Sequence, residues 1–232
     1  MIHFAILGAG SIAATMARTI QQMCESGYQE VSLYAVAARD GKRAESFAQA
    51  YGVEKGYGSY EEMLCDDAVQ LVYVATPHSH HYEHVMMCLE HGKHVLCEKA
   101  FAVNAQQARE MLQCAKNKGL LLTEAIWTRY QPMREMIAQT VHSGIIGQPK
   151  MLTANLGYEI MRKERIVEPS LAGGALLDVG IYPLNFAEMI FGPGAQIHAT
   201  CVKSDKGVDL NDSITLIWED GKMAVLNAGA NC

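Results

Sequence analysis

The feature that most restricts the fold of this 232-residue sequence is a glycine pattern near its start. Residues 8–13 read Gly-Ala-Gly-Ser-Ile-Ala and stand between an apolar run at 2–7 and a segment with helical spacing at 12–24. In this G-x-G-x-x-A pattern, Gly8 permits a tight turn, Gly10 lets a pyrophosphate approach the backbone, and Ala13 lets helix and strand pack closely. The pattern predicts a strand–turn–helix unit that binds a dinucleotide. A plain glycine turn is the alternative interpretation.

Strand and helix patterns alternate through the first half of the chain. Apolar runs at 2–7, 31–38, 69–75, 94–97 and 120–123 are separated by helix-like segments at 12–24, 41–50, 81–91 and 104–118. A short helix begins at the capping box of residues 59–62. Such alternation predicts parallel βαβ units, and continuous apolar strands indicate a sheet covered on both faces. We therefore expect an α/β fold with an N-terminal Rossmann-type parallel-sheet domain at residues 1–124.

The pattern changes after residue 124. Helices are predicted at 132–142, where Pro132 suits a first helical position, and at 178–190, with a loop at 162–174. Strands are predicted at 150–158, 196–203, 213–218 and 222–228, and the Asp-Gly pair at 220–221 is a strong hairpin signal. Residues 125–232 are thus expected to form an α+β domain with a mostly antiparallel sheet.

The residues after the second predicted strand bear on the choice of cofactor. Phosphates bind where unpaired N–H groups open a helix, here at Ser11 and Ile12. An arginine at the end of strand two suits the 2′-phosphate of NADP, and Arg39 has Arg43 one helical turn beyond it. We therefore favour NADP. Asp40 keeps NAD possible, and two solvated charges at a helix start are the other interpretation.

Composition excludes several classes of protein. The formal net charge is −6, and without a run of Lys and Arg we expect no nucleic-acid partner. No apolar stretch is long enough for a membrane span, and the chain starts directly with a strand pattern rather than a secretory signal. The seven cysteines are scattered without a C-x-x-C pair, which indicates reduced thiols and a cytoplasmic protein.

Three further segments carry a family resemblance. They are Thr76-Pro77 followed by His81, Glu98-Lys99 after the strand at 94–97, and the Asp-x-Gly-x-Tyr segment at 178–182. With the glycine loop they resemble the glucose–fructose oxidoreductase and inositol dehydrogenase (Gfo/Idh/MocA) family. Many members have proline where this chain has Ala100, and histidine where it has Tyr182. Tyrosine there, with the segments at 124–130 and 173–183, is most similar to the dihydrodiol dehydrogenase and D-xylose dehydrogenase branch.

The resemblance implies an NADP-dependent oxidoreductase that transfers a hydride between the nicotinamide and a hydroxyl-bearing carbon of a small polyol, sugar or dihydrodiol. Tyr182 would be the acid/base group. A free tyrosine has a pKa of about 10, so the ammonium of Lys99 would be needed to favour the phenolate. Asp178, four residues before Tyr182, would share its helix face and orient the substrate or Lys99. A helix N-cap is the alternative role for Asp178.

The same resemblance implies further cofactor and substrate residues. Thr76, Pro77, Glu98 and Lys99 would contact the cofactor. His81 would lie near the nicotinamide, and Trp127 would form an apolar wall for a ring-shaped substrate. Alternatively, Trp127 packs in the core and His81 is exposed to water at a helix start.

His80 and His84 have an i, i+4 spacing that can bind zinc, but no H-E-x-x-H arrangement is present, so we expect no metal.

Relatives in the family usually continue well past residue 232, so the second domain is expected to be incomplete. The alternative function is therefore a shortened, inactive NADP-binding protein or a gene fragment. The family also implies a homodimer through the C-terminal sheet, which would cover an otherwise unpaired edge.

Overall fold

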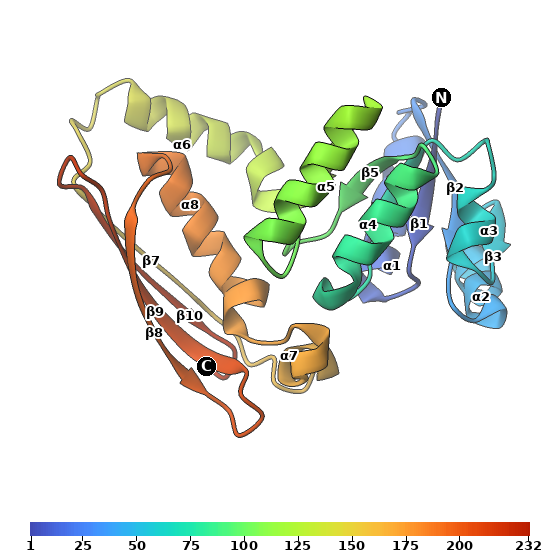
Figure 1. Ribbon diagram of the computed structural model, residues 1–232. Coiled ribbons are helices and arrows are strands. Elements are labelled where there is room, and N and C mark those ends of the chain that lie inside the picture. Colours follow the sequence, from blue (N-terminus) through green and yellow to red (C-terminus); the bar gives the residue numbers. More distant parts are fainter. The chain divides into compact units, whose positions relative to one another are not determined.

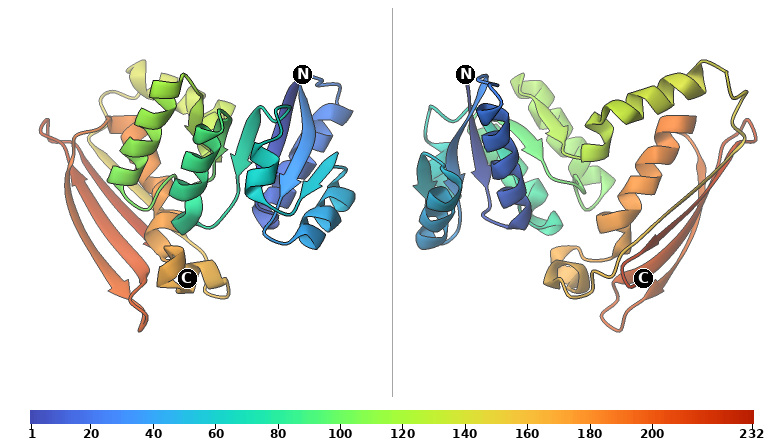
Figure 2. Two further views of the ribbon diagram at one scale, coloured as in Figure 1. Left: turned by 45° about the vertical axis from the view of Figure 1, so that its right-hand side comes forward. Right: turned by 180° about the vertical axis from the view of Figure 1, so that it is seen from behind.

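The computed structural model describes residues 1–232 and divides the chain into two compact units, Met1–Ala125 and Ile126–Cys232. Figure 1 shows both units, and Figure 2 shows them from two further sides. Each unit has its own sheet and its own buried cores.

The first unit is built on a six-stranded sheet in which every pair of neighbouring strands is parallel. The strands are β1 (Ile2–Leu7), β2 (Val31–Ala37), β3 (Lys55–Tyr57), β4 (Leu71–Val74), β5 (His94–Cys97) and β6 (Leu122–Glu124). Their order, β3-β2-β1-β4-β5-β6, is that of a doubly wound dinucleotide-binding fold. The predicted Rossmann-type sheet is confirmed. Sequence reasoning missed β3, which has only three residues.

Helices cover both faces of this sheet. They are α1 (Ser11–Glu25), α2 (Gly41–Tyr51), α3 (Tyr60–Leu64), α4 (His81–Glu90) and α5 (Ala105–Lys118), with a 3₁₀ turn at His78–His80. Small residues of α1 and Phe47 of α2 pack against one face, whereas side chains of α3, α4 and α5 pack against the other. The Ser59 side chain accepts a hydrogen bond from the backbone N–H of Glu62, so the predicted capping residue is in place.

The second unit has a four-stranded sheet in the order β7-β10-β9-β8. Its strands are β7 (Met151–Gly157), β8 (Gln196–Lys203), β9 (Asp209–Ile217) and β10 (Met223–Gly229). β10 runs parallel to β7 and antiparallel to β9, which is antiparallel to β8, so the sheet is mostly antiparallel as predicted. The hairpin at Asp220-Gly221 is confirmed, because β9 and β10 are joined there.

The helices of this unit are α6 (Pro132–His142), α7 (Glu164–Val167) and α8 (Ile181–Phe191). α8 lies along one face of the sheet (Figure 1), where Ala187 joins a core with Leu216 and Leu226. A turn of π-helix at Leu176–Gly180 leads into α8. The prediction of an unstructured loop at 162–174 is wrong in part, because α7 and a 3₁₀ turn at Pro169–Leu171 lie there.

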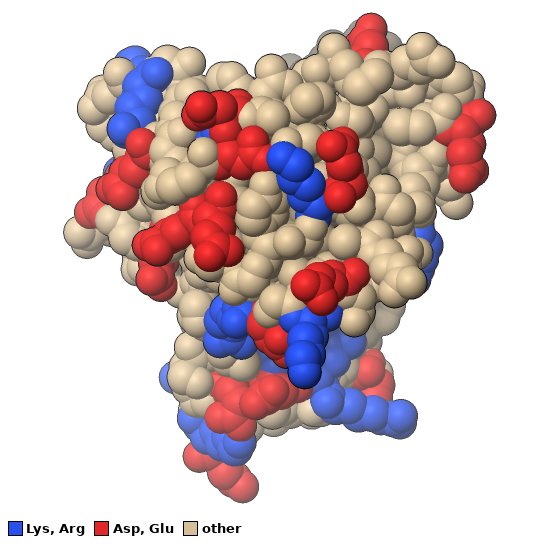
Figure 3. All heavy atoms as spheres, turned by 90° about the vertical axis from the view of Figure 1, so that its right-hand side faces the viewer, with Lys and Arg blue, Asp and Glu red and all other residues tan.

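None of the helices has the length and apolar character that crossing a membrane requires. On the face drawn in Figure 3, acidic and basic side chains are interspersed.

Candidate functional site

The glycine turn lies at the switch point of the first sheet, where the carboxyl ends of β1 and β4 are neighbours. Gly8 has a φ of +104°, and a Cβ added to it would lie 3.1 Å from the carbonyl oxygen of Ala75. A Cβ added to Gly10 would meet nothing within 4 Å. The first glycine is therefore required by the backbone, while the second leaves open space beside the turn. In doubly wound sheets this crevice is where ligands bind.

The N-terminus of α1 opens onto the same turn. Gly10 is its N-cap and offers no side-chain hydrogen bond, and the first turn holds no acidic residue. The first-turn N–H groups, those of Ser11 and Ile12 included, are thus left without a side-chain acceptor, and the helix dipole favours an anion there. This geometry fits the pyrophosphate of a dinucleotide.

The charged residues after β2 have different surroundings. Arg39 is exposed and makes no hydrogen bond or ion pair. The guanidinium of Arg43 donates to the carbonyl oxygen of Ala9 at 2.8 and 3.2 Å, so it braces the glycine turn. Asp40 caps α2 by accepting from the N–H of Lys42 at 3.0 Å. Arg39 is therefore a cation that is available to a 2′-phosphate, and the phosphate role of Arg43 stays a prediction.

His81 connects two turns at the same edge of the sheet. Its ring is fully buried, with Nδ1 2.8 Å from the carbonyl oxygen of Ala100 and Nε2 2.8 Å from that of Thr76. Burial lowers the pKa of this histidine. The interpretation of His81 as a water-exposed residue is wrong. The ring fixes the turn after β4, which contains Pro77, to the turn after β5.

His80 and His84 stack on one another, with ring centroids 5.6 Å apart. His84 Nδ1 lies 2.9 Å from the hydroxyl oxygen of Thr76, and burial lowers the pKa of His84 to about 4. No group of three or more His, Cys, Asp or Glu side chains is arranged to hold a metal ion.

Glu98 and Lys99 follow β5 directly. The Tyr73 hydroxyl donates to the Glu98 carboxylate, whose other oxygen accepts from the backbone N–H of Lys99 at 3.1 Å. The Glu124 carboxylate accepts from the N–H of Phe101 at 2.9 Å. The peptide bond between Lys99 and Ala100 is cis. Buried and half-buried polar groups thus set the path of the backbone on both sides of Lys99.

In the second unit, Trp127 and Tyr182 form a pair. Trp127 is 57% exposed, and its indole N–H donates to the Tyr182 hydroxyl at 3.0 Å. The two rings are inclined by 63° with centroids 6.2 Å apart. The interpretation of Trp127 as a core residue is wrong, because its ring presents an apolar surface beside the tyrosine hydroxyl.

Asp178 lies in the π-helical turn rather than at a helix start, so its interpretation as an N-cap is wrong. Its buried carboxylate faces Arg165 of α7, with oxygen–nitrogen distances of 2.6 and 3.4 Å. Sequence reasoning missed Arg165, which falls in the predicted loop. Among their partners, Tyr182 bonds to Trp127 and Asp178 bonds to Arg165, and the shared face of Asp178 and Tyr182 stays a prediction.

Comparison with known proteins agrees with this geometry. Residues 2–126 match the model of an oxidoreductase family with an NAD-binding Rossmann fold, GFO/IDH/MocA, and residues 130–232 match the C-terminal domain of the same family. The chain belongs to this family. It is 40% identical over 222 residues to the trans-1,2-dihydrobenzene-1,2-diol dehydrogenase of Mus musculus and 39% identical over 220 residues to that of Homo sapiens. These matches take in 95% and 94% of the chain, which spans just under two thirds of each relative, 66% and 64%.

Solved structures of a ketoreductase and of an oxidoreductase have the same fold. The 3-ketoreductase KijD10 of Actinomadura kijaniata, solved as a Y186F mutant with TDP-benzene and NADP, has a TM-score of 0.88 at 27% identity. That match covers 100% of this chain and 70% of the other. The aldose–aldose oxidoreductase of Caulobacter crescentus has a TM-score of 0.88 at 25% identity. That match covers 99% of this chain and 71% of the oxidoreductase.

Proposed function

We propose that this chain is an NADP-dependent oxidoreductase that transfers a hydride between the nicotinamide and a hydroxyl-bearing carbon of a small polyol, sugar or dihydrodiol. The observation that carries the proposal is the dinucleotide turn at the β1–β4 switch point, with Lys99 following the next strand, β5, at the same edge. Membership of the GFO/IDH/MocA family and the names of the relatives support it.

NADP is the cofactor that we propose. Its pyrophosphate would accept hydrogen bonds from the backbone N–H groups of Ser11 and Ile12, beside Gly8 and Gly10. Its 2′-phosphate would bind to the guanidinium of Arg39. The Arg39 side chain makes no hydrogen bond or ion pair, whereas Asp40 already caps α2 and is less suited to bind a ribose hydroxyl. The KijD10 structure, which contains NADP, supports this choice. When bound, the nicotinamide accepts or supplies the hydride.

We further propose how the protein handles the proton. In the oxidation direction, Tyr182 would take the proton of the substrate hydroxyl group. Lys99 would hold the same oxygen and favour the phenolate of Tyr182. Asp178 faces the guanidinium of Arg165 and would orient the substrate or Lys99.

The remaining contacts follow from the same proposal. Trp127 would form the apolar wall of the substrate site, and the turns fixed by His81, Thr76, Pro77 and Glu98 would hold the nicotinamide end. We propose a cytoplasmic location, because all seven cysteines are free and two of them are buried.

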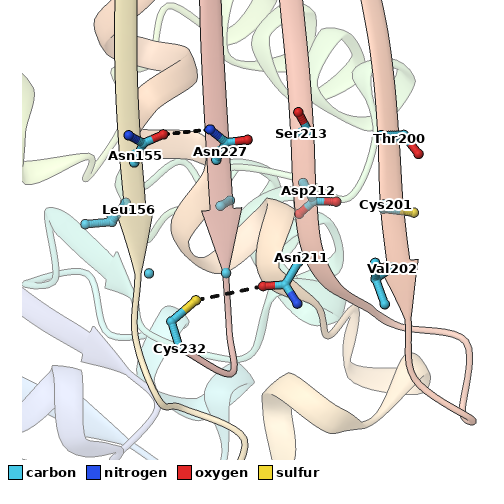
Figure 4. Close-up of a pocket in the computed structure, with 13 residues that line it drawn as sticks. Asn155, Leu156, Thr200, Cys201, Val202, Asn211, Asp212, Ser213, Asn227 and Cys232 are labelled. Atoms are coloured by element: carbon cyan, nitrogen blue, oxygen red, sulfur yellow. Dashed lines mark hydrogen bonds between the residues drawn. The ribbon is translucent and has the colours of Figure 1, made fainter.

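We also propose a homodimer through the second sheet. The face of this sheet opposite α8 carries a groove of about 390 Å³ (Figure 4). Asn155, Asn227, Ser213 and Thr200 stand in register across its four strands, and the first two are hydrogen-bonded at 2.7 Å. This row of polar side chains would offer hydrogen-bond donors and acceptors to a second copy of the chain. Light scattering of the purified protein tests this, and Asn227→Arg should shift a dimer to monomer.

The decisive experiment follows nicotinamide absorbance with NADP and D-xylose, D-glucose, myo-inositol or a trans-dihydrodiol. Tyr182→Phe should reduce turnover by about 10²–10⁴-fold, the usual contribution of a general acid/base group. Arg39→Ala should weaken NADP binding by about tenfold or more and leave NAD binding unchanged, since a charged hydrogen bond contributes about 1.5–3 kcal/mol.

The outcomes separate the alternatives. NADP binding, measured by fluorescence titration, without turnover on any substrate would favour a binding protein without catalysis. Failure to bind either cofactor would refute the dinucleotide assignment of residues 8–13. Equal activity of Tyr182→Phe and the wild-type chain would refute the role of the tyrosine.

A further inference from the structure

Two acidic residues on β9, Asp209 and Asp212, are brought together by a bulge. Side chains of a strand alternate between its faces, so residues three apart normally point in opposite directions. Here Asn211 pairs with Val202 while Asp209 pairs with Lys203, and Leu210 is the extra residue between them. This irregularity turns Asp209 toward the face of Asp212, as bulges beside functional sites commonly do. Asp209 then lies close enough to Asp212 to raise the pKa of its carboxyl group.

Asp209 also holds the start of the π-helical turn. Its carboxylate accepts a hydrogen bond from the backbone N–H of Leu176 at 2.6 Å. It lies against Gly174, where an added Cβ would come within 2.0 Å of its Oδ1. Leu176 opens the turn that contains Asp178 and continues into α8, which carries Tyr182. Asp209 is therefore the polar anchor at the beginning of the segment that presents both residues.

Asp212 is a buried residue of the same strand, β9. It is only 9% exposed, and its Oδ2 atom is buried without a hydrogen-bond partner. It follows Asn211 on β9 and is in register with Cys201 of β8 (Figure 4). A buried carboxylate with an unsatisfied oxygen is costly, and two carboxylates in contact are more costly still. When the two carboxyl groups share one proton, Asp212 is no longer a buried anion and the repulsion between two carboxylates is removed.

We infer that Asp209 and Asp212 are positioning residues that share one proton, and that this protonated pair fixes the helical segment carrying Asp178 and Tyr182. The inference rests on the proposed function for the roles of Asp178 and Tyr182. The pairing of the two carboxyls and its effect on stability do not depend on that function.

The titration behaviour agrees with this arrangement. Burial, and after it the neighbouring Asp209, raise the pKa of Asp212 to about 7. Of the other charged groups on the adjoining elements, Asp178 is already paired with Arg165, and Lys203 is exposed on β8 opposite Asp209. Neither lowers the pKa of Asp212.

The sign of the effect on stability follows from this shift. Asp212 keeps its proton in the folded chain at pH values where an unfolded aspartate, with a pKa of about 3.9, has lost it. The favourable contribution is therefore complete below pH 4 and is lost as the pH rises toward 7. In Asp212→Asn, the amide takes the place of the protonated carboxyl and still donates to Asp209, so this loss should disappear.

The test measures the thermal unfolding midpoint of the full chain from pH 5 to 9. The wild-type midpoint should fall as the pH rises through about 7. Asp212→Asn should be flat over this window and should lie about 5 °C or more above the wild type at pH 8. Asp205→Asn, an exposed position in the turn before β9, is the matched control and should follow the wild type. If Asp212→Asn does not fold, Asp209→Asn serves instead, because its amide can accept from Leu176 and donate to Asp212.

A second measurement separates positioning from bulk stability. Asp209→Ala should lower kcat at pH 6 by about tenfold or more with NADP binding unchanged, and Asp209→Asn should restore kcat. An Asp212→Asn profile that tracks the wild type would overturn the shared proton. Equal kcat for Asp209→Ala and the wild type would overturn the positioning role. Absence of all turnover in the wild-type chain would instead count against the proposed function, while the pH–stability profile would still decide on the carboxyl pair.

Discussion

Replacing Arg165 by methionine removes the cation that faces the buried carboxylate of Asp178. The two groups approach to 2.6 Å, and the Asp178 side chain is 6% exposed while that of Arg165 is 37% exposed. Breaking a fully buried pair by removing one partner costs about 3–5 kcal/mol. Because solvent reaches Arg165 and screens the interaction, we expect about 2–3 kcal/mol for Arg165→Met. This corresponds to a fall of roughly 9–13 °C in the unfolding midpoint of the second unit.

The assay can be restricted to that unit. The chain has two tryptophans, Trp127 and Trp218, and both lie within Ile126–Cys232. Urea unfolding followed by tryptophan fluorescence therefore measures the free energy of unfolding of this unit. A double-mutant cycle of Arg165→Met with Asp178→Asn should give a coupling energy of about 1.5–3 kcal/mol.

The control is the ion pair between Lys206 and Glu168, whose side chains are 56% and 32% exposed. Lys206→Met should change the free energy of unfolding by less than about 0.5 kcal/mol, as is usual for exposed pairs. A coupling between Arg165 and Asp178 as small as that of the control would refute the view that this ion pair fixes the aspartate.

Three more predictions concern single positions. Asp66 accepts hydrogen bonds from Tyr57 and two other side chains, which hold its pKa far below the usual range. Asp66→Asn should destabilise the first unit by about 2 kcal/mol at pH 7, and the difference from the wild type should shrink below about pH 4, where the wild type loses this contribution, as measured by urea unfolding at several pH values. Gly8→Ala should cost about 1–3 kcal/mol and weaken NADP binding in a fluorescence titration, because φ is +104° and Ala75 is close. Gly174→Ala should cost more than about 3 kcal/mol in urea unfolding, since its Cβ would strike Asp209.

The parts of the fold with strong local signals were predictable from the sequence. The glycine loop, the apolar strands and the Asp-Gly hairpin each combine a required backbone conformation with a regular hydrophobic period, so local reasoning finds them. β3 was missed because Lys55-Gly-Tyr57 has no apolar run, and α7 because four residues are too few to show a helical period. Both elements exist because of the surfaces they pack against.

The candidate site, like the fold, was predictable from the sequence only in part. Gly8, Gly10 and the position of Lys99 after β5 follow from local patterns and from the family resemblance. The contact of Arg165 with Asp178 depends on how α7 folds back, 13 residues earlier in the chain. The contact between Asp209 and Asp212 depends on a bulge in strand pairing, which the strand pattern at 213–218 does not reveal. Tertiary pairing, not local preference, decides these contacts.

The parallel pairing of β7 with β10 has a consequence for synthesis. Asn155 bonds to Asn227, 72 residues later in the chain. At a translation rate of about 5–20 residues per second, β7 is made roughly 4–14 s before β10, the strand with which it pairs, exists. During that time its backbone is open to other chains, and polar residues at alternate positions, Thr153 and Asn155, reduce its tendency to aggregate. The β9–β10 hairpin must therefore be made before β7 can pair with β10.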